Sequence, residues 1–456
     1  MKVNVIGSHT IAAGLMRRLS RAQMQGLTVI AIRLGGAALA LAAQVLASRM
    51  LGAEDFGRYS LLLVWMLLLG YAATAGNGHL VCRYLSQYTK AGDTAHAAGL
   101  LRFVMGAVVG LALLLAAAGI AVVHVGALGL DPRYLALGTL AFASVPLVAL
   151  QDYFESISRG LDRPELGIGP SFVLRHLAII AGLVSLLLLG READALTVMA
   201  FTVAGLLISV AVQYALLARH LRQALAGARP RYAVGRWMKT ALPMGASDTV
   251  EILLLNADIL ILGLFVAPEY VAFYFAATRL AQMLAYVPYS ATAATAQKYA
   301  ALAAPADRAE LQALIGSTAT LSTYLTAIGA VLLALLAAPL LGLFGAEFTV
   351  AAPLVALLSF GIVLSCALGP GEDVLNMLGE ERLCTLGFGI ALAVNVALNF
   401  ALIPRLGLSG AAIATVTALG VRSALLAWFA WRRLGLVLPA GLSLLPSVRR
   451  GFAHEA

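Results

Sequence analysis

The sequence predicts an all-α, polytopic membrane protein with about twelve transmembrane helices in two six-helix lobes around a central cleft. Its 456 residues are 61% hydrophobic and only 12% charged, which is far less charge than a soluble surface requires. The apolar residues form runs of roughly twenty residues or more, the length that crosses a bilayer. Several motifs of the first half also recur in the second.

The apolar runs define the expected helices, because they lack the period-two alternation of strands. The first run is too long for the core of a cleavable signal peptide, so we expect it to remain as the first spanning helix. The expected helices are 27–50, 60–80, 98–125, 134–156, 167–189, 194–218, 240–265, 271–295, 313–338, 350–369, 384–403 and 409–431.

The orientation follows from the Lys and Arg residues, which gather in the cytoplasmic loops of membrane proteins. With the N-terminus placed in the cytoplasm, the external loops hold only Arg58, Arg133, Arg191 and Arg405. Most of the other cations then fall in cytoplasmic loops and tails, so both termini are predicted to be cytoplasmic. The same bias explains the formal net charge of +9 without a nucleic acid partner.

An internal repeat relates the two halves of the chain. With six expected helices in each half, the repeat is parallel, about an axis along the membrane normal, and a substrate cleft is expected between the lobes. The matching elements are residues 51–59 and 265–273, Arg83 and Lys298, and residues 160–163 and 379–382.

The repeat and the basic segment between its halves predict the domain organisation. The expected parts are a cytoplasmic N-terminal segment (1–26), an N-terminal lobe (27–218), a basic cytoplasmic linker (219–239), a C-terminal lobe (240–433) and a cytoplasmic tail (434–456).

Three stretches carry a family resemblance. Residues 47–60 resemble the first helix junction of bacterial polysaccharide-export flippases, and residues 256–263 resemble their seventh-helix motif, in which an Asp precedes an apolar run ending in Gly. Residues 399–415 resemble their junction of helices eleven and twelve. These flippases belong to the multidrug/oligosaccharidyl-lipid/polysaccharide exporter superfamily, which also holds multidrug exporters and lipid II flippases.

The resemblance implies a flippase of the bacterial inner membrane. Its substrate would be a polyprenyl-pyrophosphate-linked oligosaccharide, an O-antigen, capsule or exopolysaccharide unit, which crosses to the outer leaflet by alternating access, with H⁺, Na⁺ or no ion coupled. The implied partners are this lipid-linked oligosaccharide, membrane lipids, a polysaccharide polymerase and glycosyltransferases. The chain departs from lipid II flippases, since it has no room for their two further helices.

Two alternative functions stay open at this point. One is a cation-coupled multidrug exporter of the same fold, which would favour an acidic, aromatic-lined cavity. The other is a membrane-embedded glycan polymerase or ligase. Such an enzyme needs a large polar external loop, whereas the external loops here are short and carry little charge.

Cationic and polar residues within the apolar runs are the substrate-binding candidates, because an ionisable side chain in the bilayer is costly and usually functional. Arg33 lies in the first expected helix, and Arg279, Gln282 and Tyr286 share one face of the eighth. A guanidinium grips phosphate oxygens and stays charged when desolvated. The alternatives are that Arg33 snorkels to the headgroups and that Arg279 pairs with a carboxylate of the seventh helix.

Arg83 and Lys298 complete the substrate-binding set. They end the second and eighth expected helices on the cytoplasmic side, where they would collect anionic headgroups at the mouth of the cleft. Alternatively, they are ordinary positive-inside anchors.

Asp248, Glu251 and Asp258 are the ion-coupling candidates. Their spacings of three and seven put them on one stripe of the seventh helix. A carboxylate in a low-dielectric site exchanges a proton readily or binds a cation. The alternative is that they neutralise Arg33 and Arg279.

The sequence predicts no catalytic centre, cofactor or metal site, and hence no enzyme. Cys82, Cys366 and Cys384 are scattered and form no metal motif. The phosphate-binding loop of ATPases and the nucleophile and metalloprotease motifs of hydrolases are also missing from the sequence.

Overall fold

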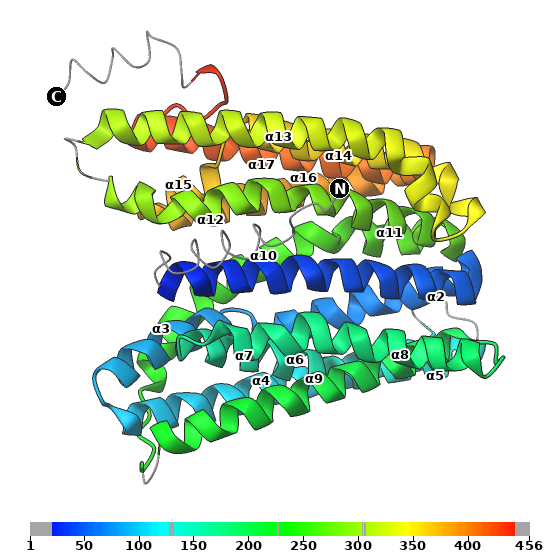
Figure 1. The fold of residues 1–456 in the computed structure, drawn as a ribbon, viewed down its shortest axis with the longest axis horizontal. Helices are drawn as coiled ribbons and strands as arrows, with labels where there is room; N and C mark the ends of the chain where they lie inside the picture. Colours follow the sequence, from blue (N-terminus) through cyan, green and yellow to red (C-terminus); the bar gives the residue numbers. More distant parts are fainter. Residues whose placement is uncertain (1–20, 127–131, 226–227, 303, 305–306, 443–456) are drawn as a thin grey trace, which may run out of the picture.

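The computed structural model describes residues 21–126, 132–225, 228–302, 304 and 307–442 (Figure 1). Within these ranges the regular structure is entirely helical, as predicted. Most of the expected 1–26 segment and residues 443–456 of the expected tail lie outside the described residues.

The helices follow the predicted order, and several are longer than their apolar runs. The first half contains α2 (Arg21–Thr74), α3 (Asn77–Lys90), α4 (Thr94–His124), η1 (Pro132–Tyr134), α5 (Leu135–Ala143), α6 (Val145–Gly160), α7 (Pro164–Gly169), η2 (Pro170–Leu174), α8 (Arg175–Leu188) and α9 (Ala195–Ala224). The second half contains α10 (Val234–Phe265), α11 (Pro268–Gln282), η3 (Met283–Ala285), α12 (Tyr286–Ala301), α13 (Arg308–Gly342), η5 (Ala346–Ala351), α14 (Ala352–Ala367), α15 (Gly371–Met377), α16 (Glu381–Leu406), α17 (Leu408–Phe429) and η6 (Ala430–Leu434).

Nine helical stretches of the described chain are long and apolar enough to cross a membrane, which confirms a multi-pass membrane protein. The first, Thr28–Thr74, contains two helices, because α2 bends at Gly52. Neither α10 nor α11 with α12 is among the nine. Carboxylates interrupt the apolar part of α10, and the turn η3 divides the eighth expected helix between Gln282 and Tyr286. The count of twelve therefore stays a prediction.

The helices form two groups that run side by side (Figure 1). In the N-terminal group, α6 packs against α3, α4 and α9, and α8 packs against α9. In the C-terminal group, α13 packs on α14, and α16 on α10 and α17. The long helix α2 lies between the groups and contacts α10 and α11 of the C-terminal group.

Two glycines bend the chain at opposite ends of the second expected helix. Gly52 (φ 73°) turns α2 at the predicted external end, and Gly76 (φ 73°) separates α2 from α3. The sequence predicts a loop over 51–59, but helical structure continues directly after Gly52. One residue at positive φ is enough for the turn, and glycine adopts this conformation without a steric cost.

The two groups are tightly packed at the predicted external end. The buried ring of Phe56 lies 5.9 Å from that of Phe275, 6.3 Å from Phe344 and 6.1 Å from Phe348, measured between ring centroids. Arg49 Nε donates to the Leu343 carbonyl at 2.7 Å. We call these four buried aromatic side chains, Phe56, Phe275, Phe344 and Phe348, the outer cluster. Their close packing leaves no room for water between them.

A second contact joins the groups near the opposite end. The backbone N–H of Gly76 donates to Asp248 Oδ2 at 2.8 Å. A side chain at Gly76 would overlap the carbonyl oxygen of Ala241 and the backbone of Gly245. Glycine is therefore needed both for the backbone conformation and for the close approach of α10.

Residues after η6 fold back onto the C-terminal group. The side chain of Gln312 exchanges two hydrogen bonds with the backbone of Val437, at 2.7 and 3.0 Å. Ala440 N–H donates to the Ala367 carbonyl at 2.8 Å, and the side chain of Leu438 is fully buried. The beginning of the expected tail is thus part of the packed structure.

Gly76→Ala is expected to lower the free energy of unfolding by about 2–3 kcal/mol, because the variant strains a positive φ and also pushes α10 away. Gly92→Ala is the matched control: Gly92 has φ 70° but open space around it, so only about 1 kcal/mol should be lost. The measurement is the apparent melting temperature of the purified protein in detergent. Equal melting temperatures for the two variants would contradict the close approach.

Candidate functional site

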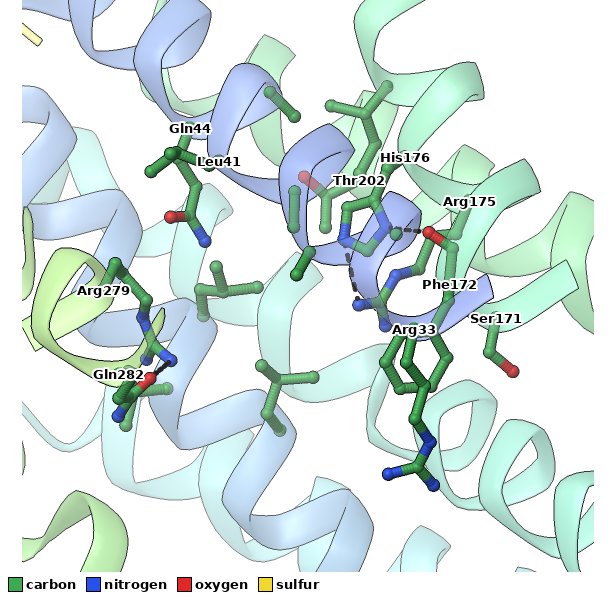
Figure 2. A pocket seen from close by; sticks show the side chains of 18 of the residues that line it. Arg33, Leu41, Gln44, Ser171, Phe172, Arg175, His176, Thr202, Arg279 and Gln282 are labelled. Atoms are coloured by element: carbon green, nitrogen blue, oxygen red, sulfur yellow. Dashed lines mark hydrogen bonds between the residues drawn. The ribbon is translucent and has the colours of Figure 1, made fainter. Parts of the chain in front are cut away.

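A cavity of about 660 Å³ lies where the two groups of helices face each other. We call it the arginine cavity, because three guanidinium groups line it. Figure 2 shows Arg33, Arg175 and His176 on one side, and Arg279 with Gln282 on the other. The charged and amide side chains in its wall are Arg33, Gln44, Gln151, Asp152, Glu155, Arg175, Arg279 and Gln282.

Arg33 reaches the cavity from the first half of α2. Its nearest carboxylate is Glu155, at 4.0 Å from Nη2 to Oε1, the outer limit of an ion pair. Its guanidinium lies 5.5 Å from the ring centre of Phe172 and 5.7 Å from that of Tyr289. Among the described residues, no group hydrogen-bonds to its buried Nε. The guanidinium is therefore held in place but retains free hydrogen-bonding capacity.

Arg279 enters the cavity from the end of α11, in the C-terminal group. Its Nη1 donates to Gln282 Oε1 at 2.8 Å, and its guanidinium stacks 4.5 Å from the centre of the Phe275 ring. As with Arg33, its buried Nε has no hydrogen-bond partner in the described part of the chain. Tyr286, on the next turn, also lines the cavity.

Arg175 is a third cavity cation that the sequence reasoning did not select. It follows the π-helical turn η2 (Pro170–Leu174), a local geometry that often marks functional sites. A side chain at Gly36 of α2 would overlap Phe172 in this turn, so α2 and η2 pack backbone against backbone. Arg175 could have been selected from the sequence, because it is an arginine within an apolar run. The Nη2 atom of Arg175 forms a hydrogen bond of 3.3 Å with Nε2 of the neighbouring His176.

The cavity also contains carboxylates that partly balance its cations. Thr74 Oγ1 donates to Asp152 Oδ2 at 2.7 Å, and Glu155 faces Arg33. With three guanidinium groups and two carboxylates in its wall, the arginine cavity keeps an excess of positive charge when all five groups are ionised.

Arg83 and Lys298 lie outside the arginine cavity. Both side chains are exposed, and Arg83 lies 5.9 Å from the ring centre of Tyr84 in α3. Of the six substrate-binding candidates, the structure therefore brings four together, namely Arg33, Arg279, Gln282 and Tyr286.

A second cavity, of about 770 Å³, lies within the C-terminal group. We call it the carboxylate cavity, because Glu251, Asp258, Glu372 and Asp373 line it with a single arginine, Arg422, among the described residues. Asp258 is 4% exposed.

The three ion-coupling candidates are divided by the structure. Glu251 and Asp258 line the carboxylate cavity. Asp258 Oδ2 accepts from the hydroxyls of Tyr274 at 2.7 Å and Thr415 at 2.9 Å. Asp248 instead accepts from the Gly76 backbone and lies 3.5 Å from His79 Nε2.

The two cavities share one wall. Gln282, Ala285 and Tyr289 line both of them. These residues surround the turn η3 (Met283–Ala285), where the eighth expected helix changes from α11 to α12. Movement of this turn would alter both cavities at once.

Comparison with solved structures identifies the fold. An inward-facing multidrug resistance MATE family transporter of the MOP superfamily superposes with a TM-score of 0.72 at 15% identity, covering 89% of this chain and 98% of that one. The outward-facing conformation of such a transporter gives a TM-score of 0.60 at 14% identity, over 90% and 94% of the chains. The lipid II flippase MurJ, in an inward closed conformation, gives 0.68 at 14% identity, over 88% and 87%.

These similarities show that the fold is that of MOP superfamily transporters, and they confirm the predicted fold class. No curated protein sequence matches the chain. A family model described as "Polysaccharide biosynthesis protein" matches residues 25–296, which is more than half of the chain and includes both Arg33 and Arg279. This protein is therefore a member of the polysaccharide biosynthesis protein family.

Proposed function

We propose that this protein is a flippase that moves a polyprenyl-pyrophosphate-linked oligosaccharide across the bacterial inner membrane, with both termini in the cytoplasm. Its family and fold are those of a MOP-type flippase or transporter. The observation that carries the finer proposal is the arginine cavity, in which Arg33, Arg175 and Arg279 line one space between the two groups of helices.

The chemistry of these side chains suits a pyrophosphate. A guanidinium forms paired, charge-assisted hydrogen bonds with phosphate oxygens and remains charged in a dry site. Arg33 and Arg279 each have a buried Nε without a partner among the described groups, and an isolated buried charge is costly. A bound dianion would offset that cost by satisfying both groups.

The polarity of the sugar units and of the polyprenyl chain indicates where each part of the substrate would lie. Gln44, Gln151 and Asp152 offer amide and carboxylate partners to sugar hydroxyls, and Tyr286 and Tyr289 offer aromatic faces. The polyprenyl chain is as apolar as the lipid around it, so it has no need to enter the cavity and stays in the bilayer.

Alternating access follows from where the arginines originate. Arg33 and Arg175 belong to α2 and α8 of the first half of the chain, whereas Arg279 belongs to α11 of the second half. A pyrophosphate that bridges them stabilises the arrangement in which they are close, and a ligand shifts a conformational equilibrium only by such differential affinity. The packed outer cluster and the better superposition on an inward-facing relative support an inward-facing state. The lobes 27–218 and 240–433 would then move against each other.

Ion coupling is assigned in this proposal to Glu251 and Asp258 of the carboxylate cavity. This cavity reaches the arginine cavity through Gln282, which also accepts a hydrogen bond from Arg279. A cation or proton in one cavity and a pyrophosphate in the other would therefore affect each other, and such coupling is reciprocal.

Arg33→Ala and Arg279→Ala are each expected to reduce surface polysaccharide by on the order of tenfold or more, because each removes a charged phosphate contact. The measurement is how far each variant, at matched protein levels, restores surface polysaccharide to a bacterial strain that lacks its oligosaccharide flippase. Arg405→Ala is the control, since Arg405 is exposed and lines neither cavity. Full complementation by both cavity variants would refute phosphate binding by these arginines.

Asp258→Asn preserves the shape of the side chain but removes its charge, so it is expected to abolish the ion dependence of pyrophosphate binding. We expect the affinity of the purified wild-type protein for inorganic pyrophosphate to change with pH or with replacement of K⁺ by Na⁺, by on the order of tenfold. The variant should respond to neither, and Glu310→Gln, at an exposed site on α13, should respond as the wild type does. Isothermal titration calorimetry provides the affinities, and an unchanged ion response in Asp258→Asn would remove this residue from coupling.

One observation favours a second candidate function, the export of cationic compounds. The carboxylate cavity combines four acidic side chains with an apolar lining that includes Leu254, Leu358 and Ile362, and such a cavity suits an organic cation. The arginine cavity has the opposite charge, and for that reason we rank this function second.

The two functions are distinguished by an efflux assay. Cells that lack their own efflux pumps and express this protein are expected to accumulate ethidium to the level of empty-vector cells, because the inter-group cavity carries excess positive charge. Lower accumulation that is lost in Asp258→Asn would instead support the exporter.

A further inference from the structure

Seven exposed cations gather on α3, near the beginning of α4 and on residues 228–239, which join the two groups of helices and include the first residues of α10. We call this surface the basic face. It comprises Arg83, Lys90, Arg102, Arg229, Arg231, Arg236 and Lys239. None of the seven takes part in the flippase mechanism proposed above.

The joining segment is packed against the N-terminal group. Trp237 is fully buried, its Nε1 donates to the Tyr88 hydroxyl at 3.1 Å, and its ring centre lies 5.6 Å from that of Phe103. Arg231 N–H donates to the Ala95 carbonyl at 2.9 Å. A side chain at Gly99 would overlap the Arg231 carbonyl. The backbone that carries these cations is thus packed against α3 and α4.

Two of these cations share one aromatic ring. The guanidinium groups of Arg83 and Arg236 lie 5.9 and 5.3 Å from the ring centre of Tyr84. Cation–π attraction favours each contact, but sharing one ring brings two positively charged guanidinium groups close together. Such an arrangement concentrates positive potential and favours an anion beside it.

Carboxylates do not neutralise the basic face. Among the described residues, no carboxylate lies within 4.0 Å of any of its seven cations, as the ion pairs show. The acid nearest in sequence, Asp93, interacts electrostatically with Arg231 but is already engaged as the N-cap of α4. It accepts from His96 N–H at 3.1 Å and contacts His96 Nδ1 at 2.7 Å. The backbone hydrogen bond lowers the pKa of Asp93 and keeps it ionised for this local role.

The basic face lies next to lipid-facing surface. On α4, Arg102 comes eight residues after Thr94, about 12 Å along the helix axis. Further along α4, Leu111, Leu113 and Leu114 are 41%, 56% and 65% exposed. In a membrane protein such leucines contact acyl chains, which puts the cations near headgroup level. Charge beside apolar surface matches an amphiphile better than an acidic protein.

We propose that the basic face binds the headgroups of anionic phospholipids in the leaflet at this end of the bundle. Lipid phosphates would neutralise the cations of α3, α4 and the joining segment while their acyl chains lie along α4. Polybasic surfaces at the membrane bind anionic lipid with an affinity that rises with each cation. The bound lipid would anchor the N-terminal group and the joining segment to the leaflet.

The test compares two triple variants of the full-length protein. One neutralises part of the basic face (Arg231→Gln, Arg236→Gln and Lys239→Gln). The other removes the same charge from exposed positions of the C-terminal group (Arg382→Gln, Arg432→Gln and Arg433→Gln). Binding of phosphatidylglycerol and phosphatidylcholine to the detergent-solubilised proteins is measured by native mass spectrometry, and melting temperatures confirm that both variants are folded.

The wild type and the C-terminal variant are expected to prefer phosphatidylglycerol, whereas the basic-face variant should lose about tenfold or more in phosphatidylglycerol affinity. Phosphatidylcholine binding should be equal in all three. An equal loss of phosphatidylglycerol affinity in both variants, or no loss in either, would overturn the proposal. The basic face would then be assigned to an acidic protein partner instead.

Discussion

The cost of an unpaired charge among apolar helices organises this protein. A chain with 12% charged residues cannot distribute them evenly through a membrane bundle, because each ionised group there needs a partner, a polar cavity or a route to the headgroups. Within the described residues, Arg33, Arg175 and Arg279 accordingly line the arginine cavity, whereas four carboxylates line the carboxylate cavity. Each of these places has a distinct chemistry, and the proposed functions follow from those differences.

Glycine packing allows these polar spaces to coexist with a close-packed bundle. Gly36 lets α2 contact η2 beside the arginine cavity, and Gly76 lets α10 approach the break between α2 and α3. Small residues have this role in membrane helices, where backbone proximity replaces the hydrophobic effect as a source of packing energy. The outer cluster around Phe56 seals the other end with aromatic rings. The result is one end that is packed shut and a charged interior between two groups of helices.

Part of the wall of the arginine cavity could be anticipated from the sequence for a physical reason, whereas the roles of its residues stay predictions. Arg33 and Arg279 were recognisable because an arginine inside an apolar run is costly, and Gln282 and Tyr286 followed from helical spacing. Arg175 satisfied the same criterion, but its position beside a π turn, facing the same cavity, depends on the packing of η2 against α2. Asp248, Glu251 and Asp258 share a helix stripe, yet neighbouring helices decide what each one meets. Asp248 meets the Gly76 backbone, whereas Asp258 meets Tyr274 and Thr415.

The amino-acid sequence by itself determined that the chain is helical and that it crosses the membrane repeatedly, and it predicted that the two halves are related. Hydropathy and repeat spacing are local properties of the chain, so tertiary contacts do not alter them. Only the tertiary structure decided that cations and carboxylates form two separate cavities with Gln282 in both walls, and that the basic linker packs against α3 and α4. Those arrangements join residues far apart in the sequence, and their geometry comes from how helices pack rather than from any single helix.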